Sequence, residues 1–106
     1  MHREIKSSAR ESFGEFAPTF VRYSEEVLFG DLWRREDLSL RDRSLITVAA
    51  LVSGGLTEQL PYHLQLAAQV GLKEEELVEG ITHLAFYVGW PRAASALQLT
   101  KKMFME

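Results

Sequence analysis

His63 is the side chain in this sequence best suited to moving a proton. We expect it on a helix that begins near Thr57 or Leu60, where it falls between Ala67 and Val70 and faces inward. The pKa of a free imidazole, about 6.5, lies near working pH, so a partly buried neutral ring can act as a general acid or base. The alternative is a core histidine that only satisfies a backbone carbonyl or a neighbouring side chain.

Two polar residues come shortly before His63 in the chain. Gln59 lies four positions earlier, on the same helix face, and its amide can orient the imidazole or a ligand. Glu58 lies about 140° from His63 round a regular helix, so the two converge only if the first turn is irregular, as Pro61 permits. The simpler interpretation of Glu58 is a solvated carboxylate that stabilises the helix N-terminus.

Arg43 is the candidate group for binding an anion. It falls in the first turns of an apolar helix, with Thr47 one turn further on. A guanidinium among apolar side chains needs an anionic partner, because burying an unpaired charge is costly. That partner is either the carboxylate of a substrate, which the guanidinium binds through two hydrogen bonds, or an acidic side chain of the protein.

Aromatic residues occur later in the chain. Trp90 and Pro91 mark a turn between two helices, where the indole either walls a pocket or closes the end of a helical bundle. Tyr87 and Gly80 share one stripe of the preceding helix. Because glycine in mid-helix costs about 1 kcal/mol relative to alanine, we expect another helix to cross close to Gly80.

The composition excludes several kinds of chemistry. The chain has no cysteine, which removes disulfides, zinc–thiolate sites, iron–sulfur clusters and thiol redox reactions. Its three histidines, His2, His63 and His83, show no metal-binding spacing, and no glycine-rich phosphate loop is present, so we expect no metal and no cofactor.

Length and charge predict a single cytoplasmic domain. The 106 residues suffice for one domain, residues 1–106, and the net charge is −3, without a basic cluster. We therefore expect neither nucleic acid nor a membrane among the partners. No apolar run approaches the roughly 20 residues of a membrane span, and the polar amino terminus does not resemble a signal peptide.

Apolar residues recur three and four positions apart, which predicts an all-α fold, a compact bundle of about six helices. The 39–53 helix is apolar nearly all round, so we expect it to be buried on all sides at the centre. Further apolar faces, such as Phe86 opposite its helix's main stripe, exceed what a small domain can bury and predict a homo-oligomer. The predicted helices are 2–13, 17–29, 39–53, one from Thr57 or Leu60, 73–88, and one from Pro91 to near the C-terminus.

Three short motifs, in this order and spacing, resemble the carboxymuconolactone decarboxylase family. They are Arg-x-Arg-Ser-Leu at 41–45, Leu-x-x-His-Leu at 60–64 and Tyr-x-Gly-Trp-Pro at 87–91. The resemblance runs from about Phe29 to the C-terminus, with shorter similarity in the segment ESFGEFAPTF. It implies the all-α fold of the alkylhydroperoxidase D-like superfamily, assembled into homotrimers or homohexamers.

The resemblance implies one of two chemistries. The first is cofactor-free decarboxylation of 4-carboxymuconolactone in the catabolism of aromatic compounds, where the unsaturated lactone accepts electrons and the protein supplies an anion clamp and a proton donor. The second is peroxide reduction by a Cys-x-x-Cys pair; Leu56 and Gln59 occupy those positions here, so we do not expect it. Gln59 also stands where the decarboxylase pattern carries a glutamate.

Together these observations predict a decarboxylase-like enzyme that acts on a small carboxylated lactone or related acid. Two alternatives stay open: a non-catalytic oligomeric protein that binds a small organic acid, and a lyase or isomerase with a different substrate. The expected site combines an anion clamp, a proton-transfer group, orienting polar groups and aromatic walls, namely Arg43 with Thr47, His63, Glu58 or Gln59, and Tyr87 with Trp90.

Overall fold

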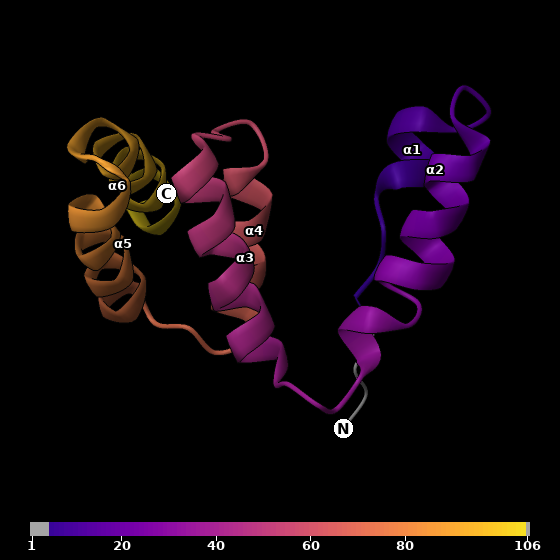
Figure 1. Ribbon diagram of the computed structural model, residues 1–106, viewed down its shortest axis with the longest axis horizontal. Coiled ribbons are helices and arrows are strands. Elements are labelled where there is room, and N and C mark those ends of the chain that lie inside the picture. Colours follow the sequence, from indigo (N-terminus) through magenta and orange to yellow (C-terminus); the bar gives the residue numbers. More distant parts are fainter. Residues whose placement is uncertain (1–4, 106) are drawn as a thin grey trace. The chain divides into compact units, whose positions relative to one another are not determined.

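The computed structural model describes residues 5–105, and within this range every regular element is a helix (Figure 1). The all-α prediction is therefore confirmed for the described part of the chain. These residues form two units, divided between Leu40 and Arg41. The prediction of one domain over residues 1–106 stays a prediction.

The first unit contains short helices. Helix α1 spans Ala9–Phe13 and α2 spans Pro18–Tyr23; a π-helical turn, η1 (Ser24–Leu28), and a 3₁₀ turn, η2 (Leu32–Arg34), follow. The 2–13 helix is wrong over residues 5–8, which are not helical, and residues 2–4 lie outside the described range. The 17–29 helix is confirmed as a helical segment over residues 18–28, but its second half is π-helical and winds more widely than an α-helix.

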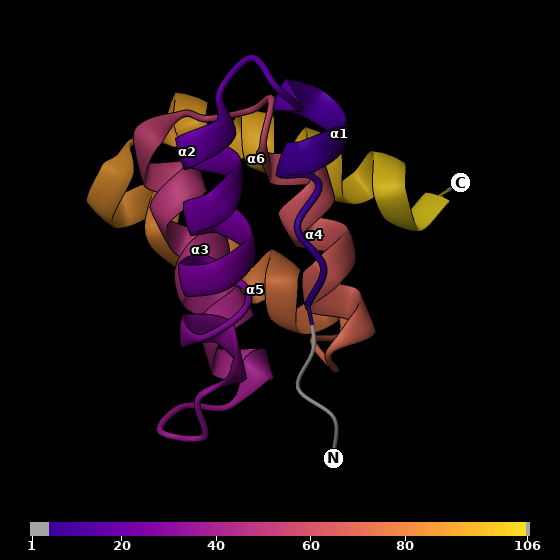
Figure 2. The ribbon, with the colours of Figure 1, turned by 90° about the vertical axis from the view of Figure 1, so that its right-hand side faces the viewer.

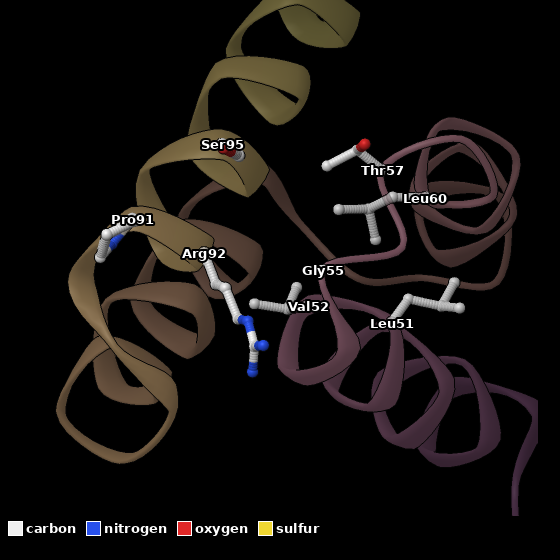
Figure 3. Close-up of a pocket in the computed structure, with 8 residues that line it drawn as sticks. All are labelled: Leu51, Val52, Gly55, Thr57, Leu60, Pro91, Arg92 and Ser95. Atoms are coloured by element: carbon white, nitrogen blue, oxygen red, sulfur yellow. The ribbon is translucent and has the colours of Figure 1, made fainter.

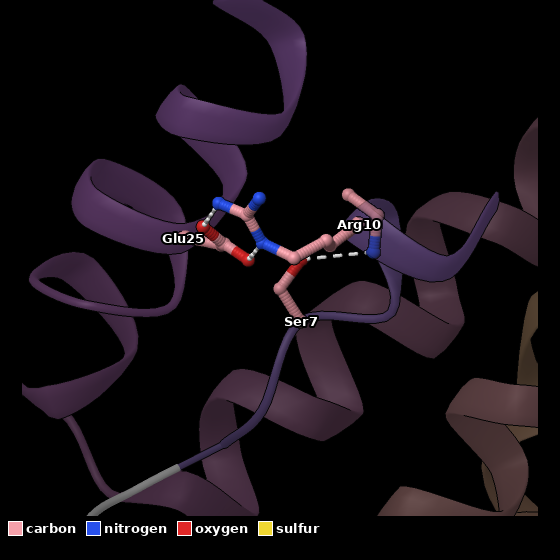
Figure 4. A network of polar contacts seen from close by, with 4 residues as sticks. Ser7, Arg10 and Glu25 are labelled. Carbon is pink, nitrogen blue, oxygen red and sulfur yellow. Dashed lines mark hydrogen bonds and ion pairs between the residues drawn. The ribbon is translucent and has the colours of Figure 1, made fainter. Parts of the chain in front are cut away.

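Gly30 shows why the chain can turn so tightly after η1. A Cβ atom at this position would overlap the carbonyl oxygen of Glu25, so only glycine fits without a shift of the backbone. The side chain of the same glutamate makes a second contact: its carboxylate accepts two hydrogen bonds from Arg10, of 2.7 and 2.8 Å (Figure 4). Ser7 accepts a further bond from the backbone N–H of Ala9 at 3.1 Å. Local polar contacts thus hold α1 to the η1 turn.

The second unit consists of two helical hairpins. Helices α3 (Leu40–Gly54) and α4 (Leu60–Gln69) run antiparallel and are joined by residues 55–59 (Figures 1 and 2). Helices α5 (Glu74–Val88) and α6 (Trp90–Met105) are joined by Gly89, and α6 packs against both α5 and α4. Pro61 lies in the first turn of α4, where a missing N–H does no harm. The predicted helices of this region are confirmed to within a few residues.

The hydrophobic core of the second unit is built from one stripe of each helix. Helix α3 contributes Val48 and Val52, which are both 1% exposed. The expectation that α3 is buried on all sides is wrong, because Leu45 and Ile46 are exposed and its buried residues form a single stripe. The other buried members of this core are Leu60, Leu64, Ala67, Leu72, Leu77, Ile81, Ala85, Ala93 and Ala96.

Gly80 has no close neighbour that explains it. A Cβ atom built there would lie 3.9 Å from Cδ1 of Leu45, which is an ordinary van der Waals distance. The expected close helix crossing is therefore wrong among the described residues. Within residues 5–105 no helix is both long and apolar enough to cross a bilayer.

Candidate functional site

His63 occupies the first turn of α4 and is half-buried. Its Nδ1 atom is shielded from solvent and has no hydrogen-bond partner among the described residues. The ring packs edge-on against Tyr62, with 5.0 Å between ring centroids. Burial lowers the pKa of His63 below its ordinary value, since the charged ring loses solvation.

These contacts favour one form of the neutral imidazole. A proton on the shielded Nδ1 would have no acceptor, whereas Nε2 is not enclosed in this way. We therefore assign the proton of the neutral ring to Nε2. In this form His63 presents an N–H group toward any ligand that reaches its open side.

Glu58 and Gln59 lie in the connection that leads into α4, and both are exposed. Gln59 is the N-cap residue of the helix, with helical backbone angles and no capping bond from its side chain. Among the described residues neither side chain hydrogen-bonds His63. The orienting role expected for them therefore stays a prediction.

Arg43 and Thr47 lie on α3 and are half-buried. The hydroxyl of Thr47 donates a hydrogen bond of 2.8 Å to the carbonyl oxygen of Arg43, one turn earlier. Because α3 and α4 are antiparallel, the first turn of α4 lies beside the last turns of α3. His63 and Arg43 are thus near opposite ends of this hairpin, about two helical turns apart along its axis.

Tyr87 and Trp90 lie on the surface of the second unit, 75% and 66% exposed. Tyr87 packs on the ring of His83, with centroids 5.0 Å apart, and Trp90 packs edge-on against Phe86 at 6.1 Å. These pairs form an exposed aromatic surface where α5 ends and α6 begins. The expectation that Tyr87 and Trp90 wall a pocket stays a prediction.

A small pocket lies where the end of α3, the 55–59 connection and the starts of α4 and α6 meet (Figure 3). Among the described residues that line it, Arg92 alone is charged, and this residue was not predicted from the sequence. The available signal was its position directly after Trp90-Pro91. Its bond to Ser53, 39 residues earlier, depends on the tertiary fold.

A wider groove, of about 700 Å³, runs along α3 and α5. Arg41 lines it and forms an ion pair with Glu76, while His83 lies further along. Among residues 5–105, no three histidine, cysteine, aspartate or glutamate side chains come together as a metal site would require.

One buried group was also missed from the sequence. Ser44 is completely buried in α3, and its hydroxyl oxygen has no hydrogen-bond partner among the described residues. The sequence does not indicate that this serine is buried without a partner, because the surroundings of its side chain are set by the packing of the helices.

Comparison with known proteins places the chain in a family. The chain matches the carboxymuconolactone decarboxylase family over residues 18–102. It is 29% identical to 4-carboxymuconolactone decarboxylase from Acinetobacter baylyi over 96 residues, 91% of this chain and 72% of that protein. It is 30% identical to a nitrosuccinic acid decarboxylase from Metarhizium robertsii over 90 residues, 81% of this chain and 63% of that protein.

The chain thus spans between three fifths and three quarters of the length of these relatives. The family match includes residues of both units and all three motifs around Arg43, His63 and Trp90. The protein belongs to the carboxymuconolactone decarboxylase family.

Proposed function

We propose that this protein is a cofactor-free decarboxylase of a small carboxylated lactone or related acid, in which His63 transfers the proton. The observation that carries the proposal is the environment of His63. Its Nδ1 is shielded without a partner among the described residues while Nε2 stays open, and His63 lies within the residues that match the family. A histidine serving only the core would satisfy its buried nitrogen.

The names of the two relatives support the substrate class. A 4-carboxymuconolactone contains an unsaturated lactone, and nitrosuccinic acid contains a nitro group. Each of these groups accepts an electron pair. A substrate with such an acceptor needs no separate cofactor to hold the electrons when carbon dioxide leaves.

The reaction requires two changes at the substrate. The bond to the carboxylate carbon breaks, carbon dioxide leaves, and the electron pair moves into the acceptor group. One proton must then be added to the carbanion equivalent. In our proposal, an anionic substrate nearby favours the charged ring, and Nε2 of that ring delivers the proton. The ring is then neutral with its hydrogen on Nδ1, and Nε2 takes up a proton from solvent to restore the charged form.

The remaining predicted residues bind and orient the substrate. Arg43 pairs with a substrate carboxylate, and Thr47 lies one turn along the same helix. Because Arg43 is about two turns from His63, the substrate must reach between them or a second carboxylate must occupy the arginine. Gln59 or Glu58 orients the imidazole, and Tyr87 with Trp90 covers the substrate.

We further propose that the protein works in the cytoplasm as a homotrimer or homohexamer. Large apolar side chains stay exposed in the described chain, among them Phe86 at 78% and Trp90 at 66%. Contiguous exposed apolar surface is typical of protein interfaces. Sedimentation equilibrium measures the mass of the assembly, and a monomer at micromolar concentration would overturn this part.

The test is release of carbon dioxide from 4-carboxymuconolactone and from nitrosuccinic acid. We expect turnover of at least one of them, and a decrease in kcat of about 10²–10⁴-fold in His63→Ala. Gln69→Ala, which removes an exposed polar side chain of the same helix, is the matched control and should keep full activity. Unchanged turnover in His63→Ala would remove the imidazole from the mechanism.

The pH profile separates proton donation from simple hydrogen bonding. Because the free ring is held neutral, kcat/KM should fall as pH rises through the lowered pKa of His63, below 6.5. Gln59→Glu places a carboxylate on the same helix face, so the falling limb should move to higher pH. Saturable binding of these acids without any turnover would instead favour the binding-protein alternative.

A further inference from the structure

The pocket beside Arg92 has the features of a binding site that is separate from His63. Its volume is about 220 Å³, and Leu51, Val52, Leu60 and Pro91 form apolar walls. Both helical hairpins contribute to it, so its shape depends on the packing of the whole second unit (Figure 3). His63 is not among the lining residues.

Arg92 gives this pocket a positive charge. Its Nη1 donates a hydrogen bond of 2.6 Å to the carbonyl oxygen of Ser53, which holds the guanidinium over the end of α3. A guanidinium has five N–H donors, and this contact uses one of them. No acidic side chain lines the pocket, and Arg92 forms no ion pair with a described residue.

Two hydroxyl groups complete the polar part of the lining. Thr57 comes from the 55–59 connection and Ser95 from the second turn of α6 (Figure 3). Neither hydroxyl bonds another described residue. The carbonyl end of α3 also borders this region, and the carbonyl group of Ser53 there accepts the hydrogen bond from Arg92.

We infer that this pocket binds a small carboxylic acid with a compact hydrocarbon body, at a position distinct from the reacting centre. The carboxylate pairs with the N–H groups of Arg92 that Ser53 does not occupy. The hydrocarbon body packs against apolar side chains of the lining, namely Leu51, Val52 and Leu60. The volume is below the usual range for drug-sized ligands, which excludes nucleotides and peptides.

The test uses benzoate as the probe and benzamide as its uncharged counterpart, with binding followed by amide chemical shifts of the full chain. Benzoate should give saturable shifts at residues 51–55, at Thr57 and at residues 91–95, and benzamide should bind at least tenfold more weakly. His63→Gln should leave the affinity for benzoate unchanged, so the result does not depend on the proposed catalysis. Absence of saturable shifts, or shifts centred on His63, would overturn the proposal.

Matched substitutions identify the role of the charge. Arg92→Gln should raise the Kd for benzoate at least tenfold, whereas Arg35→Gln, at an exposed arginine of the first unit, should not change it. Should Arg92→Gln prove unstable, Ser95→Leu fills the pocket while it keeps the guanidinium, and it should also abolish binding. Full affinity in a folded Ser95→Leu or Arg92→Gln protein would contradict the assignment.

Discussion

The two units of this chain differ in how completely they bury their apolar side chains. In the second unit, ten buried residues from the four helices and Leu72 from the connection before α5 form a continuous core. Among residues 5–40 of the first unit the buried apolar residues are Ala9, Val21 and Trp33, while Phe16 is 92% exposed. The first unit also carries the π-helical turn, whereas the helices of the second unit are regular.

This difference indicates that the second unit stabilises the chain, whereas apolar side chains of the first unit are left exposed. A segment of about 40 residues without disulfides or metal usually cannot fold by burial alone. We therefore expect the first unit to depend on contacts outside itself, and the second to supply most of the folding free energy. All seven predicted site residues lie in the second unit.

The largest expected effect compares a core residue with a surface residue. Leu64, 0% exposed in the second unit, should lower the free energy of unfolding by about 2–5 kcal/mol when replaced by alanine. Phe16→Ala in the first unit should change it by less than about 0.5 kcal/mol in the monomer. Urea denaturation measures both, and equal effects would contradict the division of stability between the units.

Two glycines offer a second, smaller comparison. Gly30→Ala should destabilise the first unit by about 1–3 kcal/mol, because the added methyl overlaps the carbonyl of Glu25. Gly80→Ala should stabilise the second by about 1 kcal/mol, because the methyl meets only Leu45 at 3.9 Å in a regular helix.

If the local packing is as described, thermal and urea unfolding should show a lower free energy of unfolding for Gly30→Ala and a higher one for Gly80→Ala. Loss of stability in Gly80→Ala would indicate that another chain or a ligand approaches this glycine closely. Loss confined to high protein concentration would assign that approach to a second copy.

The burial of His63 should make the free energy of unfolding of the second unit depend on pH. Its folded-state pKa lies below the unfolded value of about 6.5, so the unfolded chain binds more protons between the two. Stability should therefore fall as pH drops below 6.5 and level off under the lowered pKa. Urea midpoints at pH 7.5 and 5 should differ more in the wild type than in His63→Gln, and an equal difference would show that burial of the ring is not the cause.

The smallest effect concerns the exposed pair of the first unit. Hydrogen bonding from Arg10, with its charge, lowers the pKa of the Glu25 carboxyl. NMR titration should place the pKa of this carboxyl below the ordinary value for glutamate, and Arg10→Gln should return it to that value. Stability from this pair is present above the unfolded pKa of glutamate and is lost as pH falls through the lowered value, though solvent screening keeps it small.

Much of the second unit was predictable from the sequence, for local reasons. The 3.6-residue recurrence of Leu77, Ile81 and Ala85 shows which face of α5 is buried. Pro61 indicates the first turn of α4 in the same way. The first unit was predicted less well, because a π-turn and a close approach at Gly30 leave no periodic signal.

For the candidate site, too, local features could be predicted from the sequence and contacts between helices could not. The sequence alone determined that thiol chemistry is excluded, and it singled out His63 and Arg43 by residue type and helix face. Only the tertiary structure decided that these two lie near opposite ends of one hairpin, and that Arg92 reaches the end of α3. Helical periodicity involves residues a few positions apart, so the sequence shows it directly. Contacts between helices depend instead on the connections and the packing of the whole unit.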